Sequence, residues 1–340
     1  ISPNLEREII TTGDGSKTIQ IKDWEEQYHS KHGAVQEAYH VFIKHGLELF
    51  KDEEVGILEI GFGTGLNFLS TCALWQQQYL EHANTEKNSS GEHSHYTLYF
   101  YTTELYPLSL PALKKALAHC NPYPEWSTQL LAQYPDAIGG EYLLHFEIDD
   151  YCKIKLILLF GDCENSLSSL ERYSINSLER DSENSLERDS ENSLERDSVS
   201  SLERDSVSSL EQLSKNSPER DSENHPHALD TSTDGLKVDA WYLDGFAPSR
   251  NDSMWNANLF DLIGSLSHTN TTIASFTVAR SVRDELERNG FEIKKRKGFG
   301  SKREMLTAKA TSEPETTLSS KESNALSHPH AACYYRSESQ

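Results

Sequence analysis

The sequence has no apolar run long enough to cross a membrane and no cysteine pattern typical of a disulfide-rich or metal-binding protein. Its five cysteines are odd in number and form no Cys-x-x-Cys pair, which argues against a disulfide framework and against a zinc site. We therefore expect buried free thiols and no bound metal. The chain does not begin with a basic segment followed by an apolar one, so we expect a soluble, cytoplasmic protein without membrane partners.

Positive charge is also scarce, because 32 Lys and Arg residues stand against 54 Asp and Glu residues, for a formal net charge of −22. Binding to nucleic acid relies on Lys and Arg contacts with phosphates, so the overall balance argues against such a partner. The shortage is uneven, however. Six basic residues fall within ten positions: Lys294, Lys295, Arg296, Lys297, Lys302 and Arg303. This local patch is compatible with a polyanion partner and equally with an ordinary solvated surface turn.

The middle of the chain is poor in the apolar residues that a core needs. Residues 169–224 repeat an acidic eight-residue unit, Ser-Leu-Glu-Arg-Asp-Ser-Glu-Asn, with close variants. Eight residues advance a helix by about 80° beyond two turns, so successive leucines do not form one apolar stripe. We predict a disordered or loosely helical surface insertion, because so few apolar groups cannot offset its ordering entropy. We expect residues 311–340 to form a polar linker or tail, which leaves residues 1–310, interrupted by the insertion, as one expected domain.

The rest of the chain alternates short apolar segments with amphipathic ones. This alternation predicts an α/β fold with a mostly parallel, seven-stranded sheet and helices on both faces. In such sheets ligands bind at the C-terminal ends of the strands, so polar residues there are candidates for chemistry. Strands are predicted at residues 57–60, 97–102, 142–146, 154–160, 240–243, 272–276 and 304–308, and helices at residues 34–49, 66–78, 110–119, 259–266 and 278–289.

A glycine-rich loop follows the first predicted strand and contains Gly61, Gly63 and Gly65. Glycine allows a sharp turn and lets bare backbone approach a ligand, toward which the next helix aims its N-terminal amides. A dinucleotide-binding loop would carry its third glycine one place later and an acidic residue about twenty residues further on. Here Glu59 precedes the loop, which favours an S-adenosylmethionine methyltransferase over a dehydrogenase. A Gly-rich turn in another α/β domain is the remaining alternative.

Three more acidic residues follow predicted strands: Glu104, Asp162 and Asp244. A carboxylate accepts two hydrogen bonds at once, which suits Glu104 to the vicinal hydroxyls of a ribose. Asp162 is a candidate acceptor for the exocyclic amine of an adenine. Each acid has an alternative role as a helix N-cap, but three of them beside the glycine loop favour a nucleoside pocket.

Residues 243–255 hold the most unusual loop of the chain. A flat base could stack between Phe246, Pro248 and Trp255 while Asp244 faces an amine. The alternative is a structural turn with a buried aromatic side chain.

Several long segments, in the same order along the chain, resemble the methyltransferase domain of the MnmC family, which modifies the wobble uridine of tRNA. They are residues 59–68, 160–162, 243–255, 276–277 and 295–306, with a weaker likeness at residues 28–30 and 37–42. The resemblance covers roughly residues 5–310 apart from the repeats. It implies a class I S-adenosylmethionine-dependent methyltransferase fold, which is Rossmann-like, for residues 1–310.

The resemblance also implies an activity and its site. A methyl group would pass from S-adenosylmethionine to the amine of 5-aminomethyl-2-thiouridine in the tRNA anticodon, giving 5-methylaminomethyl-2-thiouridine. Asp244 would be catalytic, Phe246, Pro248 and Trp255 would shape the substrate pocket, and the six basic residues would bind the anticodon arm. The expected cofactor-binding residues are Glu59, Gly61, Gly63, Gly65, Asn67, Glu104 and Asp162.

Two-domain members of the family add an FAD-dependent oxidoreductase, and this sequence has no second dinucleotide fingerprint. FAD would therefore belong to a separate domain or partner. Two other functions remain open from the residues alone. One is a methyltransferase of small molecules or proteins, which would not need the basic run. The other is a non-catalytic interaction protein that uses the acidic repeats.

Overall fold

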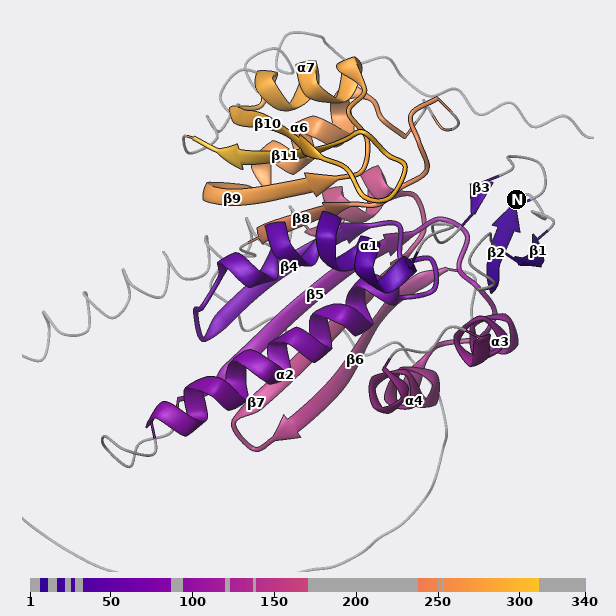
Figure 1. Ribbon diagram of the computed structural model, residues 1–340, viewed down its shortest axis with the longest axis vertical. Coiled ribbons are helices and arrows are strands. Elements are labelled where there is room, and N and C mark those ends of the chain that lie inside the picture. The colour runs from indigo at the N-terminus through magenta and orange to yellow at the C-terminus, as the bar shows by residue number, and fades with distance from the viewer. Residues whose placement is uncertain are drawn as a thin grey trace, which may run out of the picture.

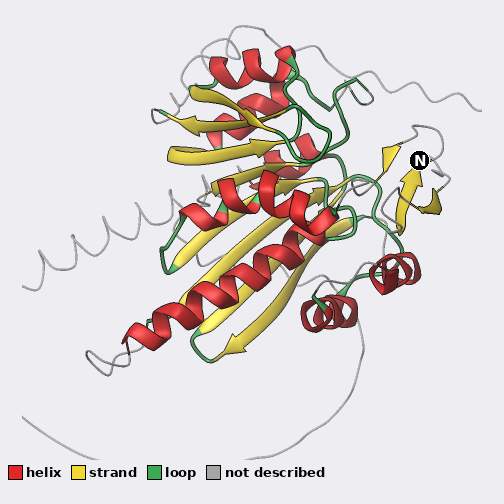
Figure 2. Ribbon diagram, in the orientation of Figure 1, coloured by secondary structure: helices red, strands yellow, loops and turns green. Residues whose placement is uncertain are grey.

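The computed structural model describes residues 7–11, 17–21, 26–27, 33–86, 94–119, 123–136, 139–170, 238–249, 251 and 254–311. Nearly all of the repeat insertion at residues 169–224 and of the tail at residues 311–340 lies outside these residues, and the predictions made for both segments stay predictions. The described part forms a central sheet covered by helices, and a separate small sheet (Figures 1 and 2).

The central sheet has eight strands in the order β10-β11-β9-β8-β4-β5-β7-β6. Its middle strands β9, β8, β4, β5 and β7 are parallel, whereas β6, β11 and β10 pair antiparallel with their neighbours. The mostly parallel α/β prediction is therefore confirmed. The strands are β4 (Glu54–Ile60), β5 (Tyr96–Glu104), β6 (Gly140–Asp149), β7 (Cys152–Phe160), β8 (Val238–Leu243), β9 (Ser267–Ser275), β10 (Phe291–Lys297) and β11 (Glu304–Ala310).

The predicted count of seven strands was wrong, because β10 was missed. This strand carries only two apolar residues, Phe291 and Ile293, before its run of basic side chains. It lies at the edge of the sheet and, among the described strands, pairs with β11 alone. An edge strand needs little apolar character, so its charges obscured the alternation that normally predicts a strand.

Helices cover both faces of the sheet, as predicted. Figure 1 shows α1 and α2 lying across the face formed by β4, β5 and β7. The helices are α1 (Ala34–Val41), α2 (Leu66–Glu86), α3 (Leu110–His119), α4 (Pro124–Gln133), α6 (Ala257–Ser265) and α7 (Arg280–Arg288), and residues 163–170 are also helical. Two short 3-10 helices, η2 (Ile43–His45) and η3 (Leu47–Leu49), follow α1.

The predicted helix at residues 34–49 is broken after Val41, and Gly46 shows why. A Cβ atom at this glycine would lie 2.3 Å from the Cε1 atom of Tyr242 in β8. The Tyr242 hydroxyl also accepts a hydrogen bond from the Leu47 amide at 3.3 Å. Contact with the sheet therefore decides the path of the chain here, and a continuous helix would not allow it.

The core is divided by the sheet into two clusters. One face packs β4 and β5 residues such as Ile57 and Phe100 against α1, α2, α3 and α4, and the other packs Leu58 and Trp241 against residues 163–170, α6 and α7. Alternate residues of β4 point to opposite faces, as the period of a strand requires. Full burial of each Leu or Ile stabilises the fold by about 1.5–3 kcal/mol. Cys72, Cys152 and Cys163 are buried free thiols, as predicted.

A three-stranded antiparallel sheet, not predicted from the sequence, contains β1 (Arg7–Thr11), β2 (Lys17–Ile21) and β3 (Glu26–Gln27). It lies apart from the central sheet and near α3 (Figure 1). Within the described part of the chain, no helix is both long enough and apolar enough to span a membrane.

Candidate functional site

The glycine loop between β4 and α2 adopts the left-handed backbone that only glycine accepts without strain. The φ angles of Gly61, Gly63 and Gly65 are 97°, 56° and 75°. A Cβ atom at Gly61 would also lie 2.9 Å from the carbonyl oxygen of Asp244. The loop thus packs directly against the end of β8, and larger residues would separate the two.

Glu104, at the end of β5, is held by the same loop. Its Oε2 atom accepts a hydrogen bond from the Gly63 amide at 2.9 Å, and its Oε1 atom accepts one from the Tyr106 amide at 2.8 Å. Two backbone donors therefore fix the direction of this carboxylate. The side chain is 8% exposed, at the rim of the loop.

Asn67, in the first turn of α2, joins two carboxylates. Its side-chain amide donates to Glu59 Oε1 at 2.8 Å and to Asp244 Oδ2 at 2.8 Å. Thr102 Oγ1 donates to the other oxygen of Glu59 at 2.8 Å. Glu59 is buried and accepts a hydrogen bond on each carboxylate oxygen, so its direct effect on the site is to orient Asn67.

Burial strongly affects both of these carboxyl groups. It raises the pKa of Glu59 well above its usual value, and the charge of Asp244 adds to the effect, while the hydrogen bonds from Asn67 and Thr102 oppose it. Burial also raises the pKa of Asp244 to about 7, against the opposing effects of Asn67 and Lys302. A carboxylate that titrates near neutral pH is well suited to accept a proton from a substrate.

Lys302 lies beside this cluster, in the loop between β10 and β11. Its Nζ atom is 3.0 Å from Glu37 Oε1 of α1 and 4.5 Å from the centre of the Phe276 ring. Its charge favours the ionised form of Asp244, whereas the charge of Glu37 disfavours it. Lys302 was predicted to bind tRNA; the structure pairs it with Glu37 at the rim of the site, and its contact with tRNA stays a prediction.

Trp255 reaches the predicted loop but is buried in the core. Its indole Nε1 donates to the Phe246 carbonyl at 2.8 Å, and its ring centre lies 6.2 Å from that of Phe260. Only 6% of the residue is exposed, so Trp255 braces the loop as a buried aromatic side chain. Phe246 and Pro248 are partly exposed on the same loop.

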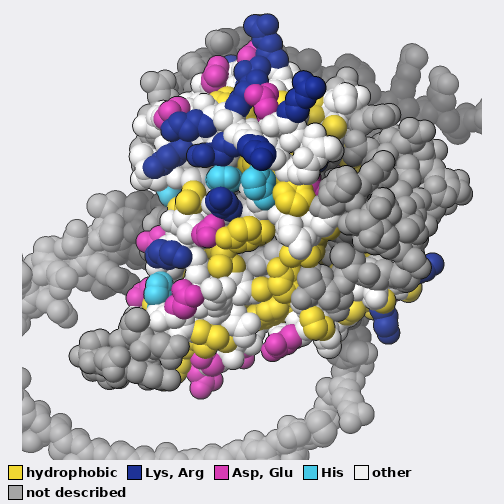
Figure 3. All heavy atoms as spheres, in the orientation of Figure 1, with side chains coloured by type: hydrophobic (Ala, Val, Ile, Leu, Met, Phe, Trp, Pro, Cys, Tyr) yellow, Lys and Arg dark blue, Asp and Glu magenta, His cyan; other side chains and the backbone are white. Residues whose placement is uncertain are grey.

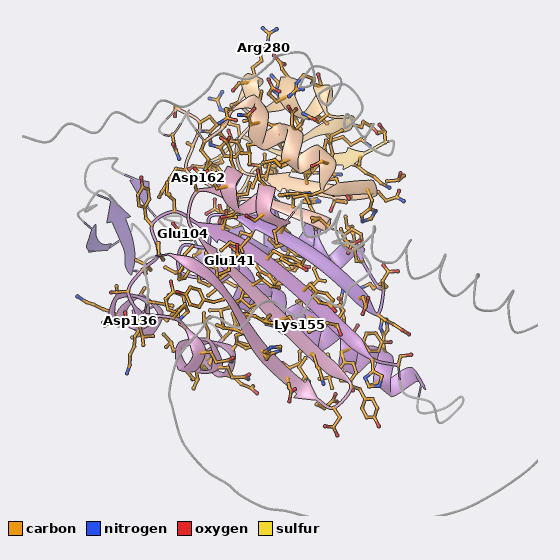
Figure 4. All side chains as sticks on the ribbon, turned by 180° about the vertical axis from the view of Figure 1, so that it is seen from behind. Glu104, Asp136, Glu141, Lys155, Asp162 and Arg280 are labelled. Atoms are coloured by element: carbon orange, nitrogen blue, oxygen red, sulfur yellow. The ribbon has the colours of Figure 1, made fainter. Side chains whose placement is uncertain are left out.

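Asp162 lies at the predicted edge of the sheet, and Figure 4 shows it at the same end as Glu104. It directly precedes the helix at residues 163–170, and its Oδ1 atom accepts a hydrogen bond from the Asn165 amide at 3.2 Å. This is the geometry of a helix N-cap, which was the alternative role predicted for it. The side chain is exposed.

The basic run is divided between β10 and the loop after it. Lys294 pairs with Glu292 at 3.2 Å and Lys295 pairs with Glu304 at 3.1 Å. Arg296 instead donates from Nε to the Thr307 hydroxyl at 2.9 Å. Lys297 and Arg303 are exposed at the two ends of the loop.

Sequence reasoning missed two residues of this site, Thr102 and Glu37. Thr102 had one usable signal, because it lies two residues before Glu104 and therefore on the same face of β5. Glu37 lies in a segment of weak family likeness, but nothing in the sequence linked it to its partner Lys302, which lies 265 residues away.

Comparison with known proteins supports a methyltransferase. The model of a family described as S-adenosyl-L-methionine-dependent methyltransferases matches residues 226–311. The tRNA 5-methylaminomethyl-2-thiouridine biosynthesis bifunctional protein MnmC of Psychrobacter cryohalolentis is 31% identical over 326 residues, which cover 91% of this chain and 37% of the relative. The protein of the same name from a Marinomonas species is 32% identical over 317 residues, covering 92% of this chain and 35% of the relative.

A solved structure shares the fold. It is the crystal structure of MnmC2 from Aquifex aeolicus, which aligns with a TM-score of 0.53 and 21% identity over 92% of this chain and 74% of that one. The chain spans about a third of the length of the curated relatives. The chain that carries the glycine loop and its carboxylates therefore matches the S-adenosyl-L-methionine-dependent methyltransferase family over residues 226–311 and is similar to the MnmC proteins over about a third of their length.

Proposed function

We propose that this chain transfers a methyl group from S-adenosylmethionine to the amine of 5-aminomethyl-2-thiouridine at the tRNA wobble position, giving 5-methylaminomethyl-2-thiouridine. The relatives named for this biosynthesis support the substrate. The observation that carries the chemistry is the position of Asp244, a carboxylate with a pKa of about 7 that Asn67 holds against the glycine loop.

The residues present fit the cofactor. S-adenosylmethionine supplies an activated methyl group on a positively charged sulfonium and carries a second positive charge on its amino group. Glu59, Glu104 and Asp244 surround the loop with negative or ionisable groups, which suit a cation. Glu104, oriented by two backbone amides, would accept hydrogen bonds from the ribose hydroxyls. Asp162 would accept a hydrogen bond from the adenine amine.

Asp244 would prepare the nucleophile. An alkylammonium has no lone pair and cannot attack a methyl group, so the amine must first lose a proton. Asp244 would accept that proton and keep the nitrogen in line with the methyl group. Phe246 and Pro248 would enclose the base, which must leave the anticodon stack to reach the site. Trp255 would hold this loop in place through its bond to the Phe246 carbonyl.

The partner would be the anticodon arm of tRNA, bound by basic residues of β10 and the following loop. An FAD-dependent oxidoreductase, in a separate domain or partner, would supply the free amine by removing a carboxymethyl group. Such a tRNA-modifying enzyme would act in the cytoplasm.

The test is tritium transfer from labelled S-adenosylmethionine into tRNA that lacks the final methyl group, followed by nucleoside analysis. Label in 5-methylaminomethyl-2-thiouridine supports cofactor, substrate and reaction together. If S-adenosylmethionine binds but no label enters tRNA, the substrate is wrong, and small molecules and proteins are tested next.

A further inference from the structure

Two segments far apart in the sequence bring basic side chains together beside the site. His40 of α1 donates from Nε2 to the carbonyl oxygen of Lys297 at 2.9 Å, because a carbonyl can only accept. The His40 ring also lies 5.7 Å from the ring of Phe299. The end of α1 and the end of β10 are therefore neighbours.

The charges in this region repel one another. Burial lowers the pKa of His45 to about 4, the positive charges of Arg296, Lys44 and His40 add to the effect, and the charge of Glu48 opposes it. Arg296, Lys44 and His40 thus each lie within electrostatic reach of His45, although they come from different elements of the chain. His45 remains uncharged at neutral pH mainly because it is partly buried, and the neighbouring positive charges make a further charge less favourable.

Acidic side chains neutralise some of the neighbouring lysines but not these residues. Lys294, Lys295 and Lys302 each pair with a carboxylate at 3.2 Å or less. Across the residues that the structure describes, no carboxylate forms an ion pair with Lys44, Arg296 or Lys297. On a chain with a net charge of −22, unneutralised cations in one place are an attractive site for an external anion.

The basic surface is continuous with the candidate active site. The loop after Lys297 contains Lys302, which forms an ion pair with Glu37. Glu37 lies one helical turn before His40 in α1. Figure 3 shows Lys and Arg side chains gathered over β10 and β11, with His side chains next to them toward α1. An extended polyanion on this surface would therefore reach the rim beside Asp244.

We propose that His40, Lys44, His45, Arg296 and Lys297 form one phosphate-binding surface, which holds the RNA backbone next to the nucleotide whose base enters the site. This inference rests on the proposed function and extends it. It adds the end of α1 and η2 to the RNA contact, and it removes Lys294 and Lys295, which their acidic neighbours already neutralise. Arg296 is suited to the role, since the bond from its Nε to Thr307 orients the guanidinium.

The test compares five variants in equilibrium binding of tRNA that carries 5-aminomethyl-2-thiouridine, between 50 and 200 mM salt. K44Q and R296Q should each reduce the slope of log affinity against log salt by about 1, and the double variant by about 2. K294Q is the matched control, because it removes the same charge from the same strand but from an existing ion pair. It should change the slope by much less.

R296K separates charge from structure, because it keeps the charge and loses the bond to Thr307, and its slope should stay near that of the wild type. Thermal melting and S-adenosylmethionine binding check that each variant is folded. The inference is overturned if K44Q and R296Q bind with the wild-type slope, or if K294Q loses as much as they do. If the wild-type protein methylates tRNA and the double variant binds tRNA normally, this inference alone is contradicted. If the wild-type protein transfers no methyl group into tRNA, the proposed function is contradicted.

Discussion

The acidic cluster around the glycine loop and the basic cluster at the ends of α1 and β10 differ in how their charges are compensated. Glu59 and Asp244 are bonded to Asn67, and burial shifts their proton affinity. Lys44 and Arg296 lie at the surface without an acidic partner among the described residues. Ionisable groups that are shielded from water need hydrogen-bond partners within the protein, whereas exposed charges are hydrated and remain available to an external partner. The comparison separates the site of chemistry from the site of attachment.

The largest expected effect comes from D244N, which removes the proton acceptor while keeping the shape of the side chain. Methyl transfer should fall by about 10²- to 10⁴-fold, the usual contribution of a general base. Affinity for S-adenosylmethionine, measured by calorimetry, should change little. An equal loss of turnover and cofactor affinity would show that Asp244 only builds the pocket.

Asn67 tests whether the acidic cluster depends on its bridge. N67A leaves the buried carboxyl group of Glu59 and the partly buried one of Asp244 without their shared donor, so the free energy of unfolding should fall by about 1–3 kcal/mol. Chemical denaturation measures this loss. The matched control is S70A, in the same helix, where the Ser70 hydroxyl donates to the Leu66 carbonyl. If both variants lose the same stability, the bridge has no special role.

Asp162 has two candidate roles that can be separated. D162A removes the N-cap of the helix at residues 163–170 and should cost about 1 kcal/mol of stability. D162S restores a capping oxygen, so it should recover the stability in thermal melts. If Asp162 also accepts the adenine amine, both variants will bind S-adenosylmethionine more weakly; cofactor affinity that follows stability alone would leave Asp162 as a cap.

The smallest expected effect is a shift in the pH profile. Activity should rise with pH through about 7 as Asp244 loses its proton. The positive charge of Lys302 favours the ionised carboxylate, so K302M should move this rise to higher pH. K295M is the control, since it removes a positive charge of the same basic run whose ion pair is with Glu304. Unchanged profiles in both variants would rule out the influence of Lys302.

Much of the fold was predictable because it depends on local patterns. Seven of the eight central strands, the alternation with helices and the glycine loop follow from periodicity and from the need for glycine at positive φ. Edge strand β10 was not predicted because its charged residues obscure the alternation of apolar and polar side chains. Trp255 shows a second limit: a tryptophan beside a polar loop has the same local signature whether it stacks on a ligand or packs in the core.

The sequence by itself determined seven of the eight central strands, their alternation with helices, the glycine loop, the acidic strand ends and the basic run, since each depends on neighbouring residues. Only the tertiary structure decided which of these groups meet. Asn67 reaches Asp244 across 177 positions, and Lys302 reaches Glu37 across 265. Burial and such distant partners set the pKa of Asp244 and decide which cations remain unpaired, because electrostatic effects depend on distance and exposure in space and not on separation along the chain.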